Sequence, residues 1–199
     1  MNLPNKISMA RIFMIPVFLV VLLVEIPVIS FEVPAVNVAL YRYIAAIIFL
    51  AAAFTDFLDG YFARKYNQIT DLGKFLDPLS DKLLVMAAML YLVGIDLLPS
   101  WIVVIILARE FIISGFRTVA ARRGVVMAAD VWGKVKTVFQ IIMITYILIE
   151  VVSLDNLLPI NLSVFSLFEM FLILSTVGLT VISGLLYVLK NIRVLSEDK

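Results

Sequence analysis

Asp56-Phe57-Leu58-Asp59-Gly60-Tyr61-Phe62-Ala63-Arg64 is the stretch that decides how this chain is interpreted, and Gly73, Asp77 and Asp81 follow it closely. These residues belong to a sequence of 199 residues that is 63% hydrophobic and has a mean hydropathy of +1.11. Ionisable groups at membrane depth cost about 2.5–3.5 kcal/mol each on insertion scales, so four aspartates need a compensating partner. A divalent metal ion is the partner that we expect.

The apolar content is well above the roughly 45–50% of soluble domains, and apolar runs long enough to cross a bilayer recur along the chain. We therefore expect an all-α, polytopic membrane protein with a single catalytic domain over residues 1–199. Histidine and cysteine are both absent, which excludes Ser-His and Cys-His nucleophile pairs, zinc sites of the His/Cys kind and disulfides. Carboxylates remain, and they suit Mg²⁺ or Mn²⁺; Mg²⁺ usually acts on phosphates.

The apolar runs predict six membrane helices, over residues 9–28, 37–62, 77–94, 99–120, 132–152 and 161–189. Lys6 and Arg11 precede the first run, an arrangement that is also typical of a signal peptide. No small-residue cleavage site follows, and Glu25 with Pro27 close the run, so we expect a retained first helix.

Basic residues predict the orientation of these helices. They lie before the first helix, between the second and third, between the fourth and fifth, and after the sixth. The other three connections hold acidic residues, and Arg42 is the only basic residue near that side. The positive-inside rule then places both termini and the aspartates on the cytoplasmic side of the cell membrane.

The four aspartates are spaced so that two helices can present them together. On a helix, Asp56 and Asp59 share one face, as do Asp77 and Asp81. Four carboxylates this close raise one another's pKa unless cations neutralise them. Two divalent ions about 3.5–4 Å apart satisfy this need and leave open coordination positions for phosphate oxygens.

Small residues and one arginine accompany the aspartates. Gly60 and Gly73 remove side chains where a substrate or a helix comes close to the backbone, Ala63 keeps the same face open, and Arg64 offers a fork suited to a diphosphate. The alternative interpretation is helix capping, with Asp77 as an N-cap before a proline at the first helical position, and Asp81 in the first turn. That alternative leaves Asp56 and Asp59 unexplained, whereas Asp71 fits an ordinary loop acid.

The full pattern resembles the signature of the CDP-alcohol phosphotransferase family of integral membrane enzymes. The resemblance implies a six-helix, usually dimeric protein with two Mg²⁺ or Mn²⁺ ions at its cytoplasmic face, where a CDP-linked lipid loses CMP as an alcohol attacks its β-phosphorus. It also implies that Asp81 is the general base. The implied metal ligands are Asp56, Asp59, Asp77 and Asp81, and the implied CDP-lipid site consists of Asn5, Asp59, Gly60, Ala63, Arg64 and Gly73.

A second cluster of charged residues is basic and concerns the acceptor alcohol. Arg109 and Arg117 are spaced eight apart and so share a helix face, and Lys134 and Lys136 open the next helix. A cationic pocket fits an acceptor that itself carries phosphate, although positive-inside anchoring is the alternative for these residues.

The wider chain resembles one branch of the family through residues 3–8, Arg109-Glu110-Phe111 and Trp132-Gly133-Lys134. This resemblance implies CDP-diacylglycerol and sn-glycerol 3-phosphate as substrates, in a homodimer surrounded by membrane lipid and without a nucleic-acid partner.

Two other interpretations remain open at this point. The first is another member of the same family, with inositol phosphate, inositol, serine or phosphatidylglycerol as its acceptor. From another class, intramembrane carboxylates also occur in cation transporters, which usually show paired repeats with broken helices. We find neither feature in the sequence, and Arg64 beside the aspartates disfavours a pure cation site.

Overall fold

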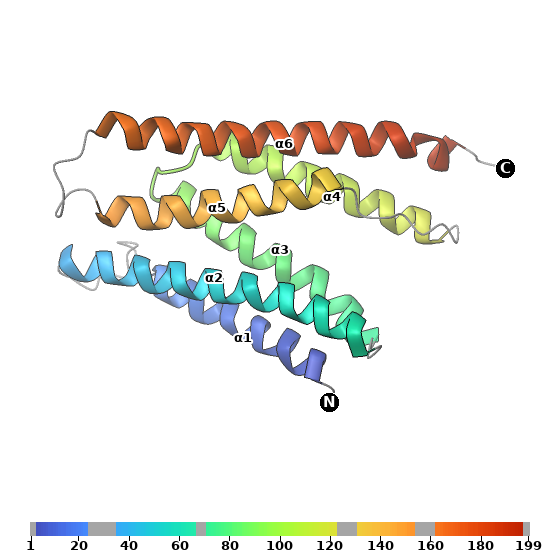
Figure 1. Ribbon diagram of the computed structural model, residues 1–199, viewed down its shortest axis with the longest axis horizontal. Helices are drawn as coiled ribbons and strands as arrows, with labels where there is room; N and C mark the ends of the chain where they lie inside the picture. Colours follow the sequence, from blue (N-terminus) through green and yellow to red (C-terminus); the bar gives the residue numbers. More distant parts are fainter. Residues whose placement is uncertain (1–2, 24–34, 67–70, 123–130, 154–161, 197–199) are drawn as a thin grey trace. The chain divides into compact units, whose positions relative to one another are not determined.

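The computed structural model describes residues 3–23, 35–66, 71–122, 131–153 and 162–196, and within them the side chains of residues 13–23, 40–55, 82–122, 131–149 and 167–191. All regular secondary structure in these ranges is helical, which confirms the all-α prediction (Figure 1). The helices are α1 (Leu3–Leu23), α2 (Ala35–Tyr66), α3 (Asp71–Gly94), α4 (Ser100–Arg122), α5 (Val131–Ser153) and α6 (Leu162–Ser196).

Each of the six expected helices is present, but several bounds differ from the predicted ones: α2 continues to Tyr66 and α6 to Ser196, and α1 and α3 begin six residues early. Helix α1 begins at Leu3, and α3 begins at Asp71. Asp77 and Pro78 consequently lie inside α3, so the interpretation of Asp77 as an N-cap is wrong, and Asp71 is not in a loop. A proline forfeits one backbone hydrogen bond and disfavours helix in the residue before it. Here the apolar residues at 72, 75, 76 and 79 continue one helical face across it.

The described helices fall into two compact units. The first contains α1, α2, α3 and the part of α5 from Ile144 onward; the second contains α4, the part of α5 up to Met143, and α6. In the first unit α1 packs against α2 and α3, and α2 also contacts α3. In the second unit α4 packs against α6.

Aromatic rings and small residues form the core of the first unit. Phe18 of α1 and Phe49 of α2 are fully buried, with ring centroids 6.0 Å apart and planes tilted by 36°. Ala45 and Ala52, one turn before and about one turn after Phe49, are fully buried as well. Small residues let two helix backbones approach closely, as is common where helices pack within a membrane. This face of α2 is therefore built for close packing around one large ring.

Arg42, the one basic residue that departed from the charge pattern, is buried in α2. It hydrogen-bonds to Tyr91 of α3, whose side chain is also buried. Buried charges are normally paired or hydrogen-bonded, because an isolated one is costly to desolvate. Arg42 is thus a packing residue between α2 and α3, and its position does not weaken the orientation inferred from the loop residues.

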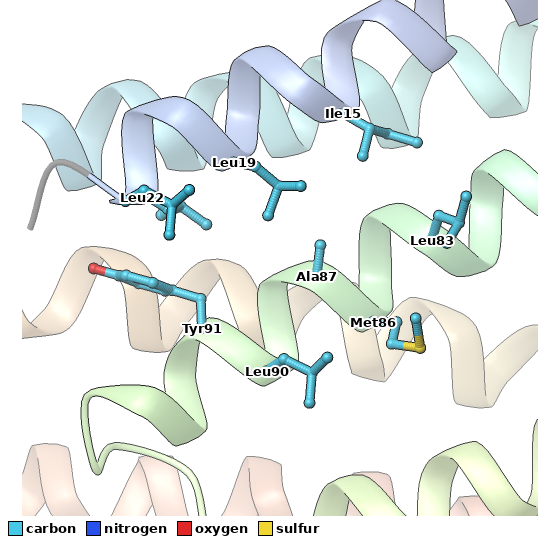
Figure 2. A pocket seen from close by; sticks show the side chains of 9 residues that line it. Ile15, Leu19, Leu22, Leu83, Met86, Ala87, Leu90 and Tyr91 are labelled. Atoms are coloured by element: carbon cyan, nitrogen blue, oxygen red, sulfur yellow. The ribbon is translucent and has the colours of Figure 1, made fainter. Parts of the chain in front are cut away.

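An apolar pocket of about 380 Å³ lies between α1 and α3. In Figure 2, Leu19 and Leu22 of α1 face Ala87 and Tyr91 of α3 across it. Its lining residues are Ile15, Leu19, Leu22, Leu23, Leu83, Met86, Ala87, Leu90 and Tyr91. None of them carries a charge and Tyr91 alone among them has a polar side-chain atom, so the pocket suits hydrocarbon better than a nucleotide or a phosphate.

Helix α3 ends in a tight turn around Asp96. Asp96 has a φ of 60°, in the left-handed region. The amide of Leu97 donates to the carbonyl of Leu92 at 2.9 Å, and the amide of Asp96 donates to that of Val93 at 3.1 Å. This pair of bonds defines a Schellman cap, which satisfies carbonyls at the helix end. The turn fixes where α3 stops and brings the chain within a few residues to Ser100.

Helix α6 places its polar side chains inside and its large apolar side chains outside. The hydroxyl residues Thr176, Thr180 and Ser183 are buried, whereas Leu174, Leu185 and other large side chains of α6 are exposed. A helix on the surface of a soluble protein shows the reverse pattern. Helices in lipid gain nothing from burying leucine and instead pack through small and hydroxyl residues. The exposed face of α6 is therefore suited to contact lipid.

Two helical segments among the described residues are long and apolar enough to cross a membrane, Val131–Ile149 in α5 and Leu167–Asn191 in α6. Shorter apolar segments occur in α1, α2 and α3, at Phe13–Leu23, Leu40–Thr55 and Lys82–Gly94. These data support membrane helices, while six complete spans remain a prediction.

Candidate active site

The aspartate signature lies on two consecutive helices of the first unit. Asp56, Asp59, Gly60, Ala63 and Arg64 occupy the last turns of α2, and Gly73, Asp77 and Asp81 occupy the first turns of α3. Asn5 lies at the beginning of α1. The side chains of all these residues lie outside those that the structure describes, so their contacts stay predictions.

The backbone already brings the two parts of the signature near each other. Helix α2 ends at Tyr66 and α3 begins at Asp71, so the chain between them spans at most ~18 Å even if fully extended. The two helices also contact each other. Because both segments are helical, each aspartate pair shares one helix face, as its spacing predicted.

The chemistry of this set of donors fits a hard divalent cation. Four carboxylates without histidine or cysteine match the oxygen ligands that Mg²⁺ and Mn²⁺ prefer. Among the side chains that the structure describes, no other group of three or more potential ligands gathers in one place. If the chain holds a metal, the aspartate signature is accordingly the place to expect it.

The second predicted cluster lies in the second unit and is described in atomic detail. Oε1 of Glu110 on α4 accepts a hydrogen bond from Nη1 of Arg109 at 3.0 Å and another from Nζ of Lys136 on α5 at 2.6 Å. The Lys136 side chain is only 2% exposed, and those of Arg109 and Glu110 are 14% and 24% exposed. Glu110 therefore holds two of the predicted acceptor-binding residues side by side, with one negative charge between two positive ones.

Arg109 makes one further hydrogen bond, and one of its nitrogens has no partner among the described residues. Its Nη2 donates to Oγ of Ser183 on α6 at 3.2 Å. Its Nε is buried and has no hydrogen-bond partner within the described part of the chain. Buried donors are almost always paired in native proteins, so a lone one needs an explanation. An anionic ligand at this arginine is a physical explanation, since phosphate oxygens readily accept from guanidinium nitrogens.

Arg117 lies two turns after Arg109 on α4 and is exposed. Its Nε donates to the hydroxyl of Tyr187 on α6 at 3.3 Å, and its guanidinium carbon lies 5.7 Å from the centroid of that ring. Lys134 is exposed on the first turn of α5, two residues before Lys136. The structure thus joins Arg109 to Lys136 through Glu110, attaches Arg117 to α6, and leaves Lys134 at the surface.

Sequence reasoning gave no role to Glu110, Ser183 or Tyr187. Glu110 follows Arg109 directly, and a carboxylate beside an arginine in an apolar helix was a signal of an ion pair. Ser183 and Tyr187 continue a run of polar residues on α6 that starts at Thr176 and keeps helical spacing. That spacing predicts a buried polar face, and it was the sequence signal from which Ser183 and Tyr187 could have been identified.

Comparison with known proteins gives independent evidence about the family of this chain. The model of the family described as CDP-alcohol phosphatidyltransferase matches residues 1–188 and so spans both units. A Bacillus subtilis protein named CDP-diacylglycerol–glycerol-3-phosphate 3-phosphatidyltransferase is 45% identical over 190 residues, which cover 96% of this chain and 95% of the relative.

Two other relatives show that the similarity extends across distant bacteria. A Rickettsia felis protein of the same name is 37% identical over 148 residues, covering 74% of this chain and 75% of the relative. A Mycobacterium tuberculosis protein named probable phosphatidylglycerophosphate synthase is 32% identical over 193 residues, covering 96% of this chain and 82% of the relative.

Proposed function

Because the chain belongs to the CDP-alcohol phosphatidyltransferase family, a family of membrane-bound enzymes of phospholipid synthesis, we propose that it transfers the phosphatidyl group of CDP-diacylglycerol to sn-glycerol 3-phosphate. The products are phosphatidylglycerol phosphate and CMP. The protein is a transferase, and its relatives from Bacillus, Rickettsia and Mycobacterium carry names for this reaction or its product.

One structural observation supports the phosphorylated acceptor in particular. Arg109 and Lys136 are both largely buried in an apolar helical unit, and they share a single carboxylate, that of Glu110. The three side chains together carry one net positive charge, and the buried Nε of Arg109 has no hydrogen-bond partner among the described residues. A phosphate group offers the missing charge and the missing acceptor oxygen. Inositol, a neutral alcohol, offers no comparable group to Arg109.

The roles of the remaining residues follow from their chemistry and from the family signature. Asp56, Asp59, Asp77 and Asp81 would hold two Mg²⁺ or Mn²⁺ ions, which when bound supply charge neutralisation for the diphosphate. Arg64 would bind the diphosphate as a fork, with Gly60, Ala63, Gly73 and Asn5 around the CDP moiety. Asp81 would accept the proton of the attacking C1 hydroxyl of glycerol 3-phosphate.

The reaction needs no covalent intermediate with the protein. The C1 oxygen of the acceptor forms a bond to the β-phosphorus, and the bond from that phosphorus to the oxygen of CMP breaks. Positioning and charge stabilisation then provide most of the rate enhancement, as in other phosphoryl transfers. The four basic residues Arg109, Arg117, Lys134 and Lys136 would bind the acceptor's own phosphate, which does not react.

The placement in the membrane is part of the proposal. We propose six spans in the cell membrane, with both termini and the aspartates at the cytoplasmic side, and a homodimer as the assembly. The basic residues at one set of helix ends and connections support the orientation, and the exposed apolar face of α6 supports contact with lipid. Diacyl tails can then stay in the bilayer while the headgroup reacts at its surface.

A transfer assay distinguishes this function from simple hydrolysis and from cation transport. In detergent micelles containing Mg²⁺ and CDP-diacylglycerol, CMP release should require glycerol 3-phosphate. Release at the same rate without any acceptor would indicate a hydrolase, and metal flux into liposomes without CMP release would indicate a transporter. Either result would overturn the proposal.

A further inference from the structure

The buried polar face of α6 lies where α6 meets α4, the helix that carries both acceptor arginines. Thr176, Thr180, Ser183 and Tyr187 are all buried and follow one another at intervals of three or four residues. Thr180 and Ser183 donate hydrogen bonds back to backbone carbonyls of α6, of Thr176 and Thr180 respectively. The hydroxyls of Thr180 and Ser183 are thus satisfied within α6, whereas Oγ1 of Thr176 has no hydrogen-bond partner among the described residues. The face contacts α4 at Ser183 and Tyr187.

The side chain of Arg109 packs against small residues, namely Gly133, Ser183 and Gly184. A Cβ atom added at Gly184 would come within 3.0 Å of Cγ of Arg109, and one added at Gly133 would come within 3.3 Å of its Nη2. Ser183, beside Gly184, accepts a hydrogen bond from the same Nη2 at 3.2 Å. A side chain at position 184 therefore requires Arg109 to shift by a few tenths of an ångström, so this glycine and this serine constrain the path and the direction of the guanidinium.

Arg117 is held by the next turn of the same helix. Tyr187 is only 4% exposed, while Arg117 is exposed. The tyrosine hydroxyl accepts from Nε of Arg117 at 3.3 Å, and the ring lies beneath the guanidinium at 5.7 Å. Both a hydrogen bond and a cation–π contact orient a cation that would otherwise sample many rotamers. A buried ring thus gives an exposed arginine a fixed direction.

We infer that Ser183, Gly184 and Tyr187 are positioning residues, which orient Arg109 and Arg117 so that the enzyme selects a phosphorylated acceptor. The inference rests on the proposed function, because it assigns the two arginines to the acceptor phosphate. A guanidinium binds phosphate through two parallel hydrogen bonds only when its plane is correctly aimed, and groups behind the arginine set that aim. These residues of α6 contact no reacting atom, and they act only by orienting Arg109 and Arg117 of α4.

The test compares two glycines on the same helix. Gly184→Ala introduces a methyl group against Arg109, whereas Gly178→Ala introduces one where no atom lies within 4 Å. Gly184→Ala should raise the KM for glycerol 3-phosphate roughly tenfold, with the KM for CDP-diacylglycerol changed by less than about twofold. Gly178→Ala should leave both values close to wild type. Alanine favours a helix more than glycine does, so neither change should prevent folding.

Tyr187→Phe provides a second variant that removes a single oxygen and keeps the buried ring. It should raise the acceptor KM by a smaller factor, about threefold, because the cation–π contact remains. The inference would be overturned if both variants kept the wild-type acceptor KM, or if they weakened both substrates equally. If the wild-type protein did not use glycerol 3-phosphate at all, the proposed function itself would fail, and the two failures are therefore distinguishable.

Discussion

Nζ of Lys136 lies 2.6 Å from Oε1 of Glu110, so α4 and α5 are joined by an ion pair whose lysine is almost completely buried. The same oxygen also accepts a hydrogen bond from Arg109. A buried pair of this kind is weak evidence for net stability, because desolvation offsets much of the attraction. Removing one partner destabilises the protein, because the other charge then stays buried without its counter-charge. We propose that the arrangement keeps two cations close together near a ligand anion.

Glu110→Gln should therefore destabilise the protein. Loss of charge-assisted hydrogen bonds to Lys136 and Arg109 should lower the free energy of unfolding by roughly 1.5–3 kcal/mol. Unfolding in an SDS titration, followed by tryptophan fluorescence, measures the change. The matched control is Glu169→Gln on α6, for which the described residues show no ion pair or hydrogen bond. Equal stability of the two variants would mean that the Glu110 pair contributes nothing. Adding Lys136→Met to Glu110→Gln should recover part of the loss, because the buried cation is then gone.

The aspartate signature should be indispensable for turnover and dispensable for folding. Asp56→Asn, Asp77→Asn and Asp81→Asn each keep the side-chain size while removing one carboxylate charge, so each variant should insert into membranes and still lose most of its activity. Excess EDTA should likewise abolish wild-type activity, and added Mg²⁺ or Mn²⁺ should restore it. Wild-type rates in excess EDTA would contradict the proposed metal site. Asp71→Asn, just outside the signature on α3, is the control and should remain active.

The positive-inside pattern predicts opposite sides for two positions in the chain. A reporter fused after Lys199 should be cytoplasmic, and one inserted in the turn at Asp96 should be external. The reason is that basic residues concentrate at one set of helix ends and the connections beside them, and acidic residues in the other connections. Paired phosphatase and fluorescent-protein fusions measure both positions in intact cells. The reverse result would place the aspartates on the external face, away from the CDP-lipid pool.

Arg117→Ala should impair binding of the acceptor much more than binding of the CDP-lipid. Losing a charge-assisted hydrogen bond costs roughly 1.5–3 kcal/mol, so the KM for glycerol 3-phosphate should rise at least about tenfold. Arg117→Lys should be intermediate, because it keeps the charge but loses the fork. Arg122→Ala, an exposed arginine in the last turn of the same helix, is the control and should behave like wild type. An equal effect of Arg117→Ala on both substrates would remove Arg117 from the acceptor site.

Much of the fold follows from the sequence because hydropathy and charge are decisive in a membrane. Apolar runs predicted all six helices, and Pro99 lies just before α4, as the sequence suggested. The start of α3 was misplaced because Asp77-Pro78 looks locally like a helix start. Apolar positions on both sides of the proline prevailed over that local signal. Likewise, the early start of α1 at Leu3 was hidden by the polar residues that precede the first apolar run.

The candidate site was predictable only in part, for a physical reason. Sequence spacing reveals which residues share one helix face, and it placed Arg109 and Arg117 correctly on α4. It does not reveal which side chains of another helix lie against that face, because such contacts depend on tertiary packing. The contacts of Arg109 with Ser183 and of Arg117 with Tyr187 therefore emerged only from the structure. The division of the helices into two units was equally invisible in the sequence.

The identity of the product tests the central claim most directly. Purified protein in mixed micelles with Mg²⁺ and labelled CDP-diacylglycerol is offered glycerol 3-phosphate, inositol phosphate, serine or phosphatidylglycerol in separate reactions, and the labelled lipid is identified by mass spectrometry. We predict phosphatidylglycerol phosphate as the main product, formed with glycerol 3-phosphate and accompanied by an equal amount of CMP. A faster reaction with any of the other three acceptors, or no lipid product with glycerol 3-phosphate, would contradict the account.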